Sequence, residues 1–215
     1  DWVTATVPVG MYPTSVALNP VTNRVYVGNE LSDYVTVIDG ATNKKTIVIA
    51  GQIPVAVAVN PVTNKIYVAN KGSDNVTVID GATNARTTLS AGVNPYAVAV
   101  NPVTNRIYVA EWGDSVVAGD VMIIDGATNS TKRVSAGLHP RAVVVNPVTN
   151  KIYVADQDGD IVTVIDGATD STTTVSVGTF PWVLAVNAVT NKIYVVNNSR
   201  DDVTVIDGAN NATTT

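Results

Sequence analysis

A five-residue motif, NPVTN, recurs along the chain at nearly constant spacing. It begins at Asn19, Asn60, Asn101 and Asn146, and a variant, NAVTN, begins at Asn187. The successive spacings are 41, 41, 45 and 41 residues, and an IDG tripeptide recurs in the same register. Because the NPVTN motif and the IDG tripeptide recur in the same register, they indicate a tandem array of five repeats. A repeat of this length restricts the fold more strongly than any local pattern of residues. The third interval carries a four-residue insertion.

Each repeat contains four short runs of alternating or β-branched residues. In the second repeat these runs are 55–60, 65–70, 75–80 and 85–91. Period-two alternation of Val, Ile, Thr and Tyr predicts strands with one face inward. The NPVTN and DGATN segments between runs have the residues that tight turns favour. Four antiparallel strands in every repeat of about 40–45 residues predict propeller blades, whereas the coils of a β-solenoid, the alternative, are usually shorter and lack hairpins.

The sequence therefore predicts an all-β protein, a single β-propeller domain over residues 1–215. We expect five four-stranded antiparallel blades at about 10–50, 51–91, 92–136, 137–177 and 178–215. Residues 3–9 align with the fourth strand of a blade, and the last repeat stops part-way into its own fourth strand. We expect the segment 3–9 to complete the last blade and close the ring, which hides two sheet edges. Exchange of these end strands between chains is the alternative.

Composition argues against several classes of partner. The net charge is −5, and no cluster of Lys and Arg suits a phosphate backbone, so we expect no nucleic acid. No apolar stretch approaches the ~18 residues of a spanning helix, so we expect no membrane insertion. The chain has no cysteine, which excludes disulfides, thiol nucleophiles and cysteine-based zinc sites.

The strings KIYVAN, from Lys65, and NVTVIDGATN, from Asn75, carry a family resemblance together with the G-x-x-P step. They resemble the YVTN-type β-propeller repeats of archaeal surface-layer proteins and bacterial exported proteins. The resemblance covers essentially the whole chain, although those propellers are mostly seven-bladed. It implies an extracellular, cell-surface or periplasmic location. Four triplets that fit the N-glycosylation pattern, at Asn75, Asn129, Asn197 and Asn211, are consistent with export.

The loops of the repeats differ in variability between the two edges of the predicted blades. Loops joining the first to the second and the third to the fourth strand are nearly identical, whereas second-to-third loops and the G-x-x-P steps vary. Variable loops on a rigid scaffold commonly carry function, and a concave mouth with aromatic and polar groups suits ligand binding. Solvated loop decoration is the alternative. The candidate ligand-binding residues are Tyr12, Tyr96, Trp112, His139, Arg141, Phe180, Trp182, Asn29, Asn70 and Asn197.

No catalytic motif is present in the sequence. His139 is the only histidine, and with Glu111 and Asp156 it is a candidate for acid–base chemistry or a mixed nitrogen–oxygen metal site. The run DQDGD sets Asp156, Asp158 and Asp160 at alternate positions, as in calcium loops, without the distal glutamate of the EF-hand. An ordinary turn explains the same run. We expect no cofactor, and calcium or magnesium is the ion that such a site would hold.

These features favour a non-catalytic, exported recognition or scaffold module. Its partner would be a glycan, a peptide or a protein bound over the variable loops. Two alternatives stay open: a metal-assisted lyase or hydrolase at the channel mouth, and a structural subunit that polymerises by end-strand exchange.

Overall fold

The computed structural model describes residues 4–115 and 117–215, and within them twenty strands form five four-stranded antiparallel sheets. Each sheet follows chain order, and we call the sheets blades 1 to 5. Blade 1 holds β1 (Pro13–Asn19), β2 (Arg24–Asn29), β3 (Tyr34–Asp39) and β4 (Lys45–Ile49). Blade 2 holds β5 (Pro54–Asn60), β6 (Lys65–Asn70), β7 (Asn75–Asp80) and β8 (Arg86–Ser90).

Blade 3 holds β9 (Pro95–Asn101), β10 (Arg106–Glu111), β11 (Asp120–Asp125) and β12 (Thr131–Ser135). Blade 4 holds β13 (Pro140–Asn146), β14 (Lys151–Asp156), the 3-10 helix η1 (Gln157–Gly159), β15 (Ile161–Asp166) and β16 (Thr172–Ser176). Blade 5 holds β17 (Pro181–Asn187), β18 (Lys192–Asn197), β19 (Asp202–Asp207) and β20 (Thr213–Thr214). The prediction of five four-stranded antiparallel blades is confirmed.

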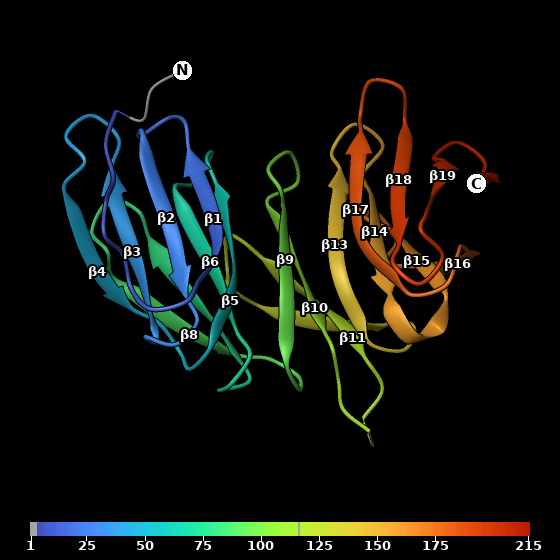
Figure 1. The fold of residues 1–215 in the computed structure, drawn as a ribbon, viewed down its shortest axis with the longest axis horizontal. Coiled ribbons are helices and arrows are strands. Elements are labelled where there is room, and N and C mark those ends of the chain that lie inside the picture. Colours follow the sequence, from blue (N-terminus) through green and yellow to red (C-terminus); the bar gives the residue numbers. More distant parts are fainter. Residues whose placement is uncertain (1–3, 116) are drawn as a thin grey trace. The chain divides into compact units, whose positions relative to one another are not determined.

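The chain divides into two compact units, residues 1–90 and 91–215. The first unit holds blades 1 and 2, and the second holds blades 3 to 5. Within each unit the first strands of consecutive blades are neighbours, so β1 lies beside β5, and β13 lies beside both β9 and β17 (Figure 1). Alternate residues of the middle strands therefore pack between the blades of one unit, and a buried tyrosine recurs there in β2, β10 and β14.

The invariant turns join neighbouring blades through side chains. Within each unit, the first Asn of an NPVTN motif accepts hydrogen bonds from its own turn, and its amide donates to the last Asn of the motif in the following blade. The donor–acceptor distance is 2.9 Å from Asn19 to Asn64 and 2.8 Å from Asn101 to Asn150. The glycine of each IDG tripeptide lies against that same last Asn, since a Cβ on Gly81 would lie 2.3 Å from Asn64 Oδ1. The repetition of NPVTN and IDG thus reflects blade-to-blade contacts as well as turn geometry.

Within each unit, a cation at the start of the second strand adds a further contact to the following blade. Arg106 Nη1 donates to the carbonyl oxygen of Gly167 at 2.8 Å, and Lys151 Nζ donates to that of Gly208 at the same distance. Because these cations reach the glycine turn of the next blade, they set neighbouring blades of one unit in register.

The amino-terminal segment differs from its prediction. Among the described residues 4–10 no strand is present, and the expected strand 3–9 begins in residues outside the described part. The carbonyl oxygen of Pro8 instead accepts a hydrogen bond from Lys45 Nζ at 2.7 Å, beside the fourth strand of blade 1. Blade 5 forms a two-residue fourth strand of its own, β20. Ring closure by the amino-terminal segment therefore stays a prediction.

Within the described residues, no helix is long and apolar enough to cross a bilayer.

Candidate functional site

The residue that ends each second strand is buried in every blade. This position holds Asn29, Asn70, Glu111, Asp156 and Asn197, whose side chains are at most 2% exposed. Each packs under the glycine of the preceding G-x-x-P step, where a Cβ would clash; on Gly137 it would lie 2.7 Å from the Cβ of Asp156. Contacts this close require glycine. The three asparagines predicted to bind ligand therefore belong to the interior of the blades.

In blades 1, 2 and 5 this position forms a neutral amide–hydroxyl pair. The side-chain amide of Asn29 donates to Thr36 Oγ1 at 3.0 Å, and that of Asn70 donates to Thr77 Oγ1 at 2.9 Å. Asn197 makes the same bond to Thr204 at 2.8 Å. Satisfied hydrogen bonds of this kind offset the cost of burying polar groups.

Blade 3 replaces the neutral pair by an ion pair. Met122 stands where the other blades have threonine, and Arg133 on β12 pairs directly across from it. Arg133 Nε donates to Glu111 Oε2 at 2.7 Å, and the Gly92 amide donates to Glu111 Oε1 at 2.6 Å. Glu111 is thus committed to a structural ion pair instead of facing His139, as the acid–base hypothesis required.

Blade 4 keeps the threonine but buries a carboxyl. The hydroxyl of Thr163 donates to Asp156 Oδ2 at 2.6 Å, and the Thr163 amide donates to the same oxygen at 3.0 Å. Burial raises the pKa of Asp156 from 3.8 to about 6, against the opposing effect of the Thr163 hydroxyl. Asp156 therefore lies below the surface, turned toward β15.

On the variable edge, backbone hydrogen bonds link the two loops of each blade. The residue before each proline has a left-handed backbone, with φ of 54° at His139 and 62° at Phe180. Its carbonyl oxygen accepts a hydrogen bond from the second-to-third loop of its own blade, as in Gln157 N to His139 O at 3.0 Å and Asn198 N to Phe180 O at 2.9 Å. These bonds do not depend on side-chain identity, so the side chains of this edge can vary.

Six of the predicted ligand-binding residues gather on the variable edge of blades 3 to 5. The Trp112 ring stacks on the His139 ring with centroids 4.9 Å apart. Trp112 also contacts Tyr96, and the centroids of these two rings are 5.3 Å apart. Phe180 stacks on Trp182 at 5.8 Å. We call Tyr96, Trp112, His139, Arg141, Phe180 and Trp182 the aromatic cluster.

Arg141 joins the two halves of the aromatic cluster. Its guanidinium carbon lies 3.2 Å from the centroid of the Trp182 ring and 5.1 Å from that of Tyr96. Cation–π contacts of this kind fix the plane of a guanidinium while its edges keep N–H donors. One donor, Nη1, reaches Gln157 Oε1 at 3.3 Å. Trp182 is 38% exposed, so part of this surface is open to a ligand.

His139 is hydrogen-bonded to Asp158 at the rim of the aromatic cluster. Its Nδ1 lies 2.6 Å from Asp158 Oδ2, and the Gln157 amide donates to Asp158 Oδ1 at 3.2 Å. The hydrogen bond from His139 holds the pKa of Asp158 below its usual value. Gln157 and the pairing role of Asp158 were not predicted as part of a ligand site, because the sequence suggested only a metal loop here.

The carboxylates of the predicted metal loop face different partners. Asp156 bonds to Thr163, Asp158 to His139, and Asp160 Oδ1 accepts from the Phe180 amide at 2.8 Å. Across residues 4–115 and 117–215, no group of three His, Cys, Asp or Glu residues is placed to hold a metal ion. Tyr12, the remaining predicted residue, lies in the first unit and is exposed.

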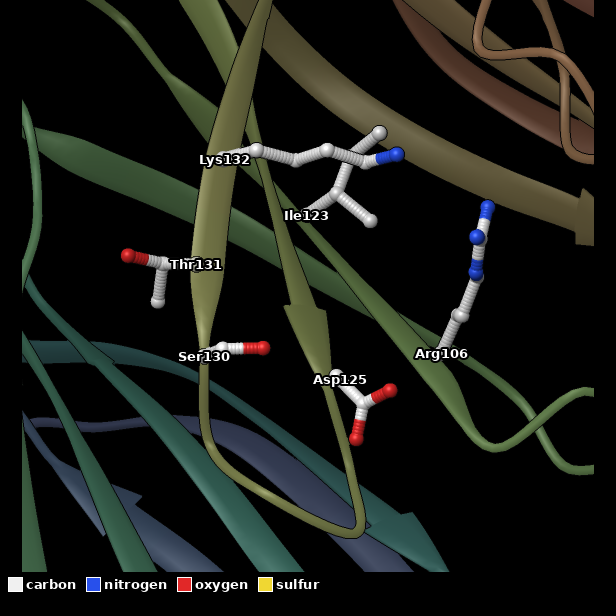
Figure 2. Close-up of a pocket in the computed structure, with 6 residues that line it drawn as sticks. All are labelled: Arg106, Ile123, Asp125, Ser130, Thr131 and Lys132. Atoms are coloured by element: carbon white, nitrogen blue, oxygen red, sulfur yellow. The ribbon is translucent and has the colours of Figure 1, made fainter.

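A pocket on blade 3 lies at the invariant edge, where the side chains of Arg106, Asp125 and Lys132 approach it (Figure 2). Equivalent pockets occur beside Arg24 in blade 1 and Lys151 in blade 4, so the blade architecture itself creates them. Arg106 and Lys132 both form salt bridges with Asp170. The aromatic cluster, in contrast, occurs once among the described residues, and individual sites are expected where a repeat breaks.

The sequence matches the model of a family described as YNCE-like beta-propeller over residues 3–214. A segment of 34 residues is 62% identical to the PE-PGRS family protein PE_PGRS18 of Mycobacterium tuberculosis; it makes up 16% of this chain and 7% of that protein.

Solved structures share the fold at low sequence identity. A chain of a nidogen/laminin complex superposes with a TM-score of 0.73 and 15% identity, covering 94% of this chain and 78% of that one. A chain of U3-55K gives a TM-score of 0.80 at 8% identity over 96% of this chain and 64% of that one. A chain of Kuenenia stuttgartiensis hydrazine synthase gives 0.62 at 18% identity, covering 96% and 80%. At these identities the likeness concerns the fold alone.

Proposed function

Because the chain belongs to the YNCE-like β-propeller family, we propose that it is a non-catalytic recognition module whose ligand binds at the aromatic cluster. The observation that carries the proposal is the guanidinium of Arg141 held 3.2 Å from the Trp182 ring centroid beside the stacked rings of Trp112 and His139. Such a surface offers ring faces to a flat or cyclic group and N–H donors to an acidic one. A glycan or a peptide that carries both groups fits this chemistry.

The non-catalytic character of the proposal rests on how the titratable groups are engaged. His139 is paired with Asp158, while Glu111 and Asp156 are buried in their own blades. A general acid or base has to come within hydrogen-bond reach of a substrate. His139 is thus better suited to position a ligand than to work with Glu111 or Asp156 in a reaction.

We also propose that the module acts outside the cytoplasm, at the cell surface, in the periplasm or in the extracellular medium. The resemblance to exported YVTN-type propellers supports this location. Fractionation of the source cells tests it, and recovery of the protein solely in the cytosolic fraction would contradict it.

Glycan and peptide arrays, followed by titration of the hits with tryptophan fluorescence, test the binding proposal. We expect Trp182→Ala to weaken the best hit roughly thirtyfold, since truncating an aromatic hot spot costs about 2 kcal/mol or more. Tyr12→Ala removes an exposed aromatic residue from the equivalent step of blade 1 and should leave the affinity unchanged. Arrays without a hit, or equal affinity for Trp182→Ala and the unmodified protein, would refute the proposal.

A further inference from the structure

The variable edge of blade 4 carries its polar side chains in a continuous row of contacts. Arg141 Nη1 donates to Gln157 Oε1 at 3.3 Å, and Gln157 Nε2 donates to Asp158 Oδ1 at 3.2 Å. Asp158 Oδ2 in turn lies 2.6 Å from His139 Nδ1. Gln157 is only 6% exposed, so its side chain is held in place between its two partners. The guanidinium of Arg141 and the imidazole of His139 are therefore the two ends of one polar chain.

The buried carboxyl of Asp156 lies close to both of these ends. The Cα of Asp156 pairs with that of Pro140, the residue that separates His139 from Arg141 on β13. The next residue, Gln157, bonds to Arg141 through its side chain and to the carbonyl oxygen of His139 through its backbone amide at 3.0 Å. Because Asp156 is fully buried, water and salt screen a charge on it only weakly.

The guanidinium of Arg141 has hydrogen-bond donors left for a ligand. The other arginines of blades 3 to 5, Arg106, Arg133 and Arg200, each pair with a carboxylate. Among the described residues of these blades no carboxylate pairs with Arg141, whose contacts are aromatic rings and a neutral amide. A guanidinium has five N–H donors, and a carboxylate accepts two of them in parallel. The uncompensated charge of Arg141 thus fits a carboxylate.

Two groups beside Arg141 change charge near neutral pH, and both changes make the site more negative. Burial raises the pKa of Asp156 to about 6, so this carboxyl is neutral in mild acid and charged above it. Histidine side chains lose their positive charge between pH 5 and pH 8, and His139 faces the carboxylate of Asp158. An anion bound by Arg141 favours the protonated form of both groups, so binding takes up protons and the affinity falls as the pH rises.

The neighbouring loops add charges but no further histidine, since His139 is the only one in the chain. Ion-paired or exposed carboxylates and guanidinium groups keep their charge between pH 5 and pH 8. The other charged groups of these loops are the ion pairs of Glu111 with Arg133 and of Asp202 with Arg200, and the exposed carboxylates of Asp114, Asp160 and Asp201.

We propose that the aromatic cluster binds a carboxylate carried beside a ring, and that it holds this ligand in mild acid and releases it as the pH rises through neutrality. The proposal rests on the proposed function, because it assigns the acidic group of that ligand to Arg141. The ring of the ligand packs on the rings of the cluster, and its carboxylate takes the remaining N–H donors of Arg141. Asp156 acts on the ligand solely through the charge that it places beside Arg141.

Nuclear magnetic resonance titration with phenylacetate, and with phenylacetamide as its neutral counterpart, provides the test. The unmodified chain should bind phenylacetate roughly tenfold more tightly at pH 5.5 than at pH 8, because like charges a few ångströms apart repel strongly beside a protein surface. Phenylacetamide should bind equally at both pH values. Arg141→Gln should remove the preference for phenylacetate over phenylacetamide. Galacturonate has the same carboxylate on a sugar ring, so tighter binding of galacturonate than of phenylacetate would identify the ligand as a sugar acid.

Two asparagine variants identify the groups that cause the pH dependence. Asparagine occupies the positions equivalent to Asp156 and His139 in other blades, at Asn70 and Asn94, so Asp156→Asn and His139→Asn should both fold. Each variant alone should reduce the pH dependence of the phenylacetate affinity, and the double variant should abolish it. Asp201→Asn removes an exposed carboxylate from the same edge of blade 5 and should keep the full dependence.

The possible failures are distinguishable. Equal affinity for phenylacetate and phenylacetamide, or an affinity for phenylacetate that does not change between pH 5.5 and pH 8, overturns the proposal. A double variant that is folded by circular dichroism and keeps the pH dependence overturns the role of Asp156 and His139. If neutral glycans or peptides bind at the aromatic cluster and phenylacetate does not, the proposal fails while the recognition module stands. If none of these compounds binds at any pH, the proposed function fails as well.

Discussion

Asp156→Asn tests whether the buried carboxyl at the end of β14 lowers stability at neutral pH. The folded state holds the proton of Asp156 up to a pKa of about 6, whereas the unfolded chain releases it near the usual pKa of 3.8. Between these two values folding takes up a proton, so the free energy of unfolding falls as the pH rises from about 4 to about 6. A pKa difference of about two units corresponds to roughly 3 kcal/mol of stability lost at pH 7.

The asparagine variant should recover most of that free energy. Asn29, Asn70 and Asn197 occupy the same position in other blades and donate to a threonine hydroxyl at 3.0, 2.9 and 2.8 Å. Thr163 supplies the matching hydroxyl in blade 4. The side chain at residue 156 would then be neutral at every pH, and its share of the pH dependence would disappear.

Urea unfolding followed by tryptophan fluorescence from pH 4 to pH 8 measures both effects. The free energy of unfolding of Asp156→Asn should exceed that of the unmodified chain by up to roughly 3 kcal/mol at pH 7, with the difference vanishing near pH 4. Asp160→Asn, in the same loop but exposed, is the control and should show no such convergence. A variant that is less stable at pH 7, or that keeps the slope of the unmodified chain between pH 4 and pH 6, would refute the reasoning.

Two further substitutions test the contacts that hold the blades. Gly81→Ala should cost about 1 to 3 kcal/mol of unfolding free energy because its Cβ would lie 2.7 Å from the carbonyl oxygen of Asn64. Gly159→Ala, whose Cβ meets its nearest atom at 3.3 Å, is the control, and equal losses in thermal unfolding would contradict the packing argument. Arg133→Ala should cost roughly 1 to 3 kcal/mol, reduced by the partial exposure of Arg133, because it leaves the buried Glu111 carboxylate without its cation. Adding Glu111→Gln should recover much of that loss in urea unfolding, and a double variant as unstable as Arg133→Ala would argue against the ion pair.

The repeat was sufficient to predict the strands and turns. The predicted runs 65–70 and 75–80 are β6 and β7 with the same bounds, because period-two patterning and turn residues are local signals. The grouping of Trp112, His139 and Trp182 on one edge also followed from the alternation of loops along the blade.

Side-chain direction at the ends of the strands could not be predicted in the same way. Asn29 and Asn197 were expected at the channel mouth, yet they point inward, because the Cβ-free glycine of the G-x-x-P step lets them pack beneath the loop. The pairing of Glu111 with Arg133 joins residues 22 apart on different strands. A signal for it was present in the sequence: Met122 breaks the threonine pattern in the repeat that also replaces asparagine by Glu111.

The two edges of the blades differ in how they are held together, which explains why the loop sequences vary on one edge and not on the other. On the invariant edge, contacts between blades pass through side chains, as from Asn146 to Asn191 at 2.9 Å, so a change at either residue breaks a bond. On the variable edge, every blade has backbone bonds such as Trp112 N to Asn94 O at 2.9 Å, which survive substitution, although side chains such as Asp160 also take part. Aromatic and charged residues could therefore accumulate on blades 3 to 5 without loss of the fold. The two edges depend unequally on side-chain hydrogen bonds. This difference, more than the exposure of either edge, determines where in such a repeat a binding site can arise.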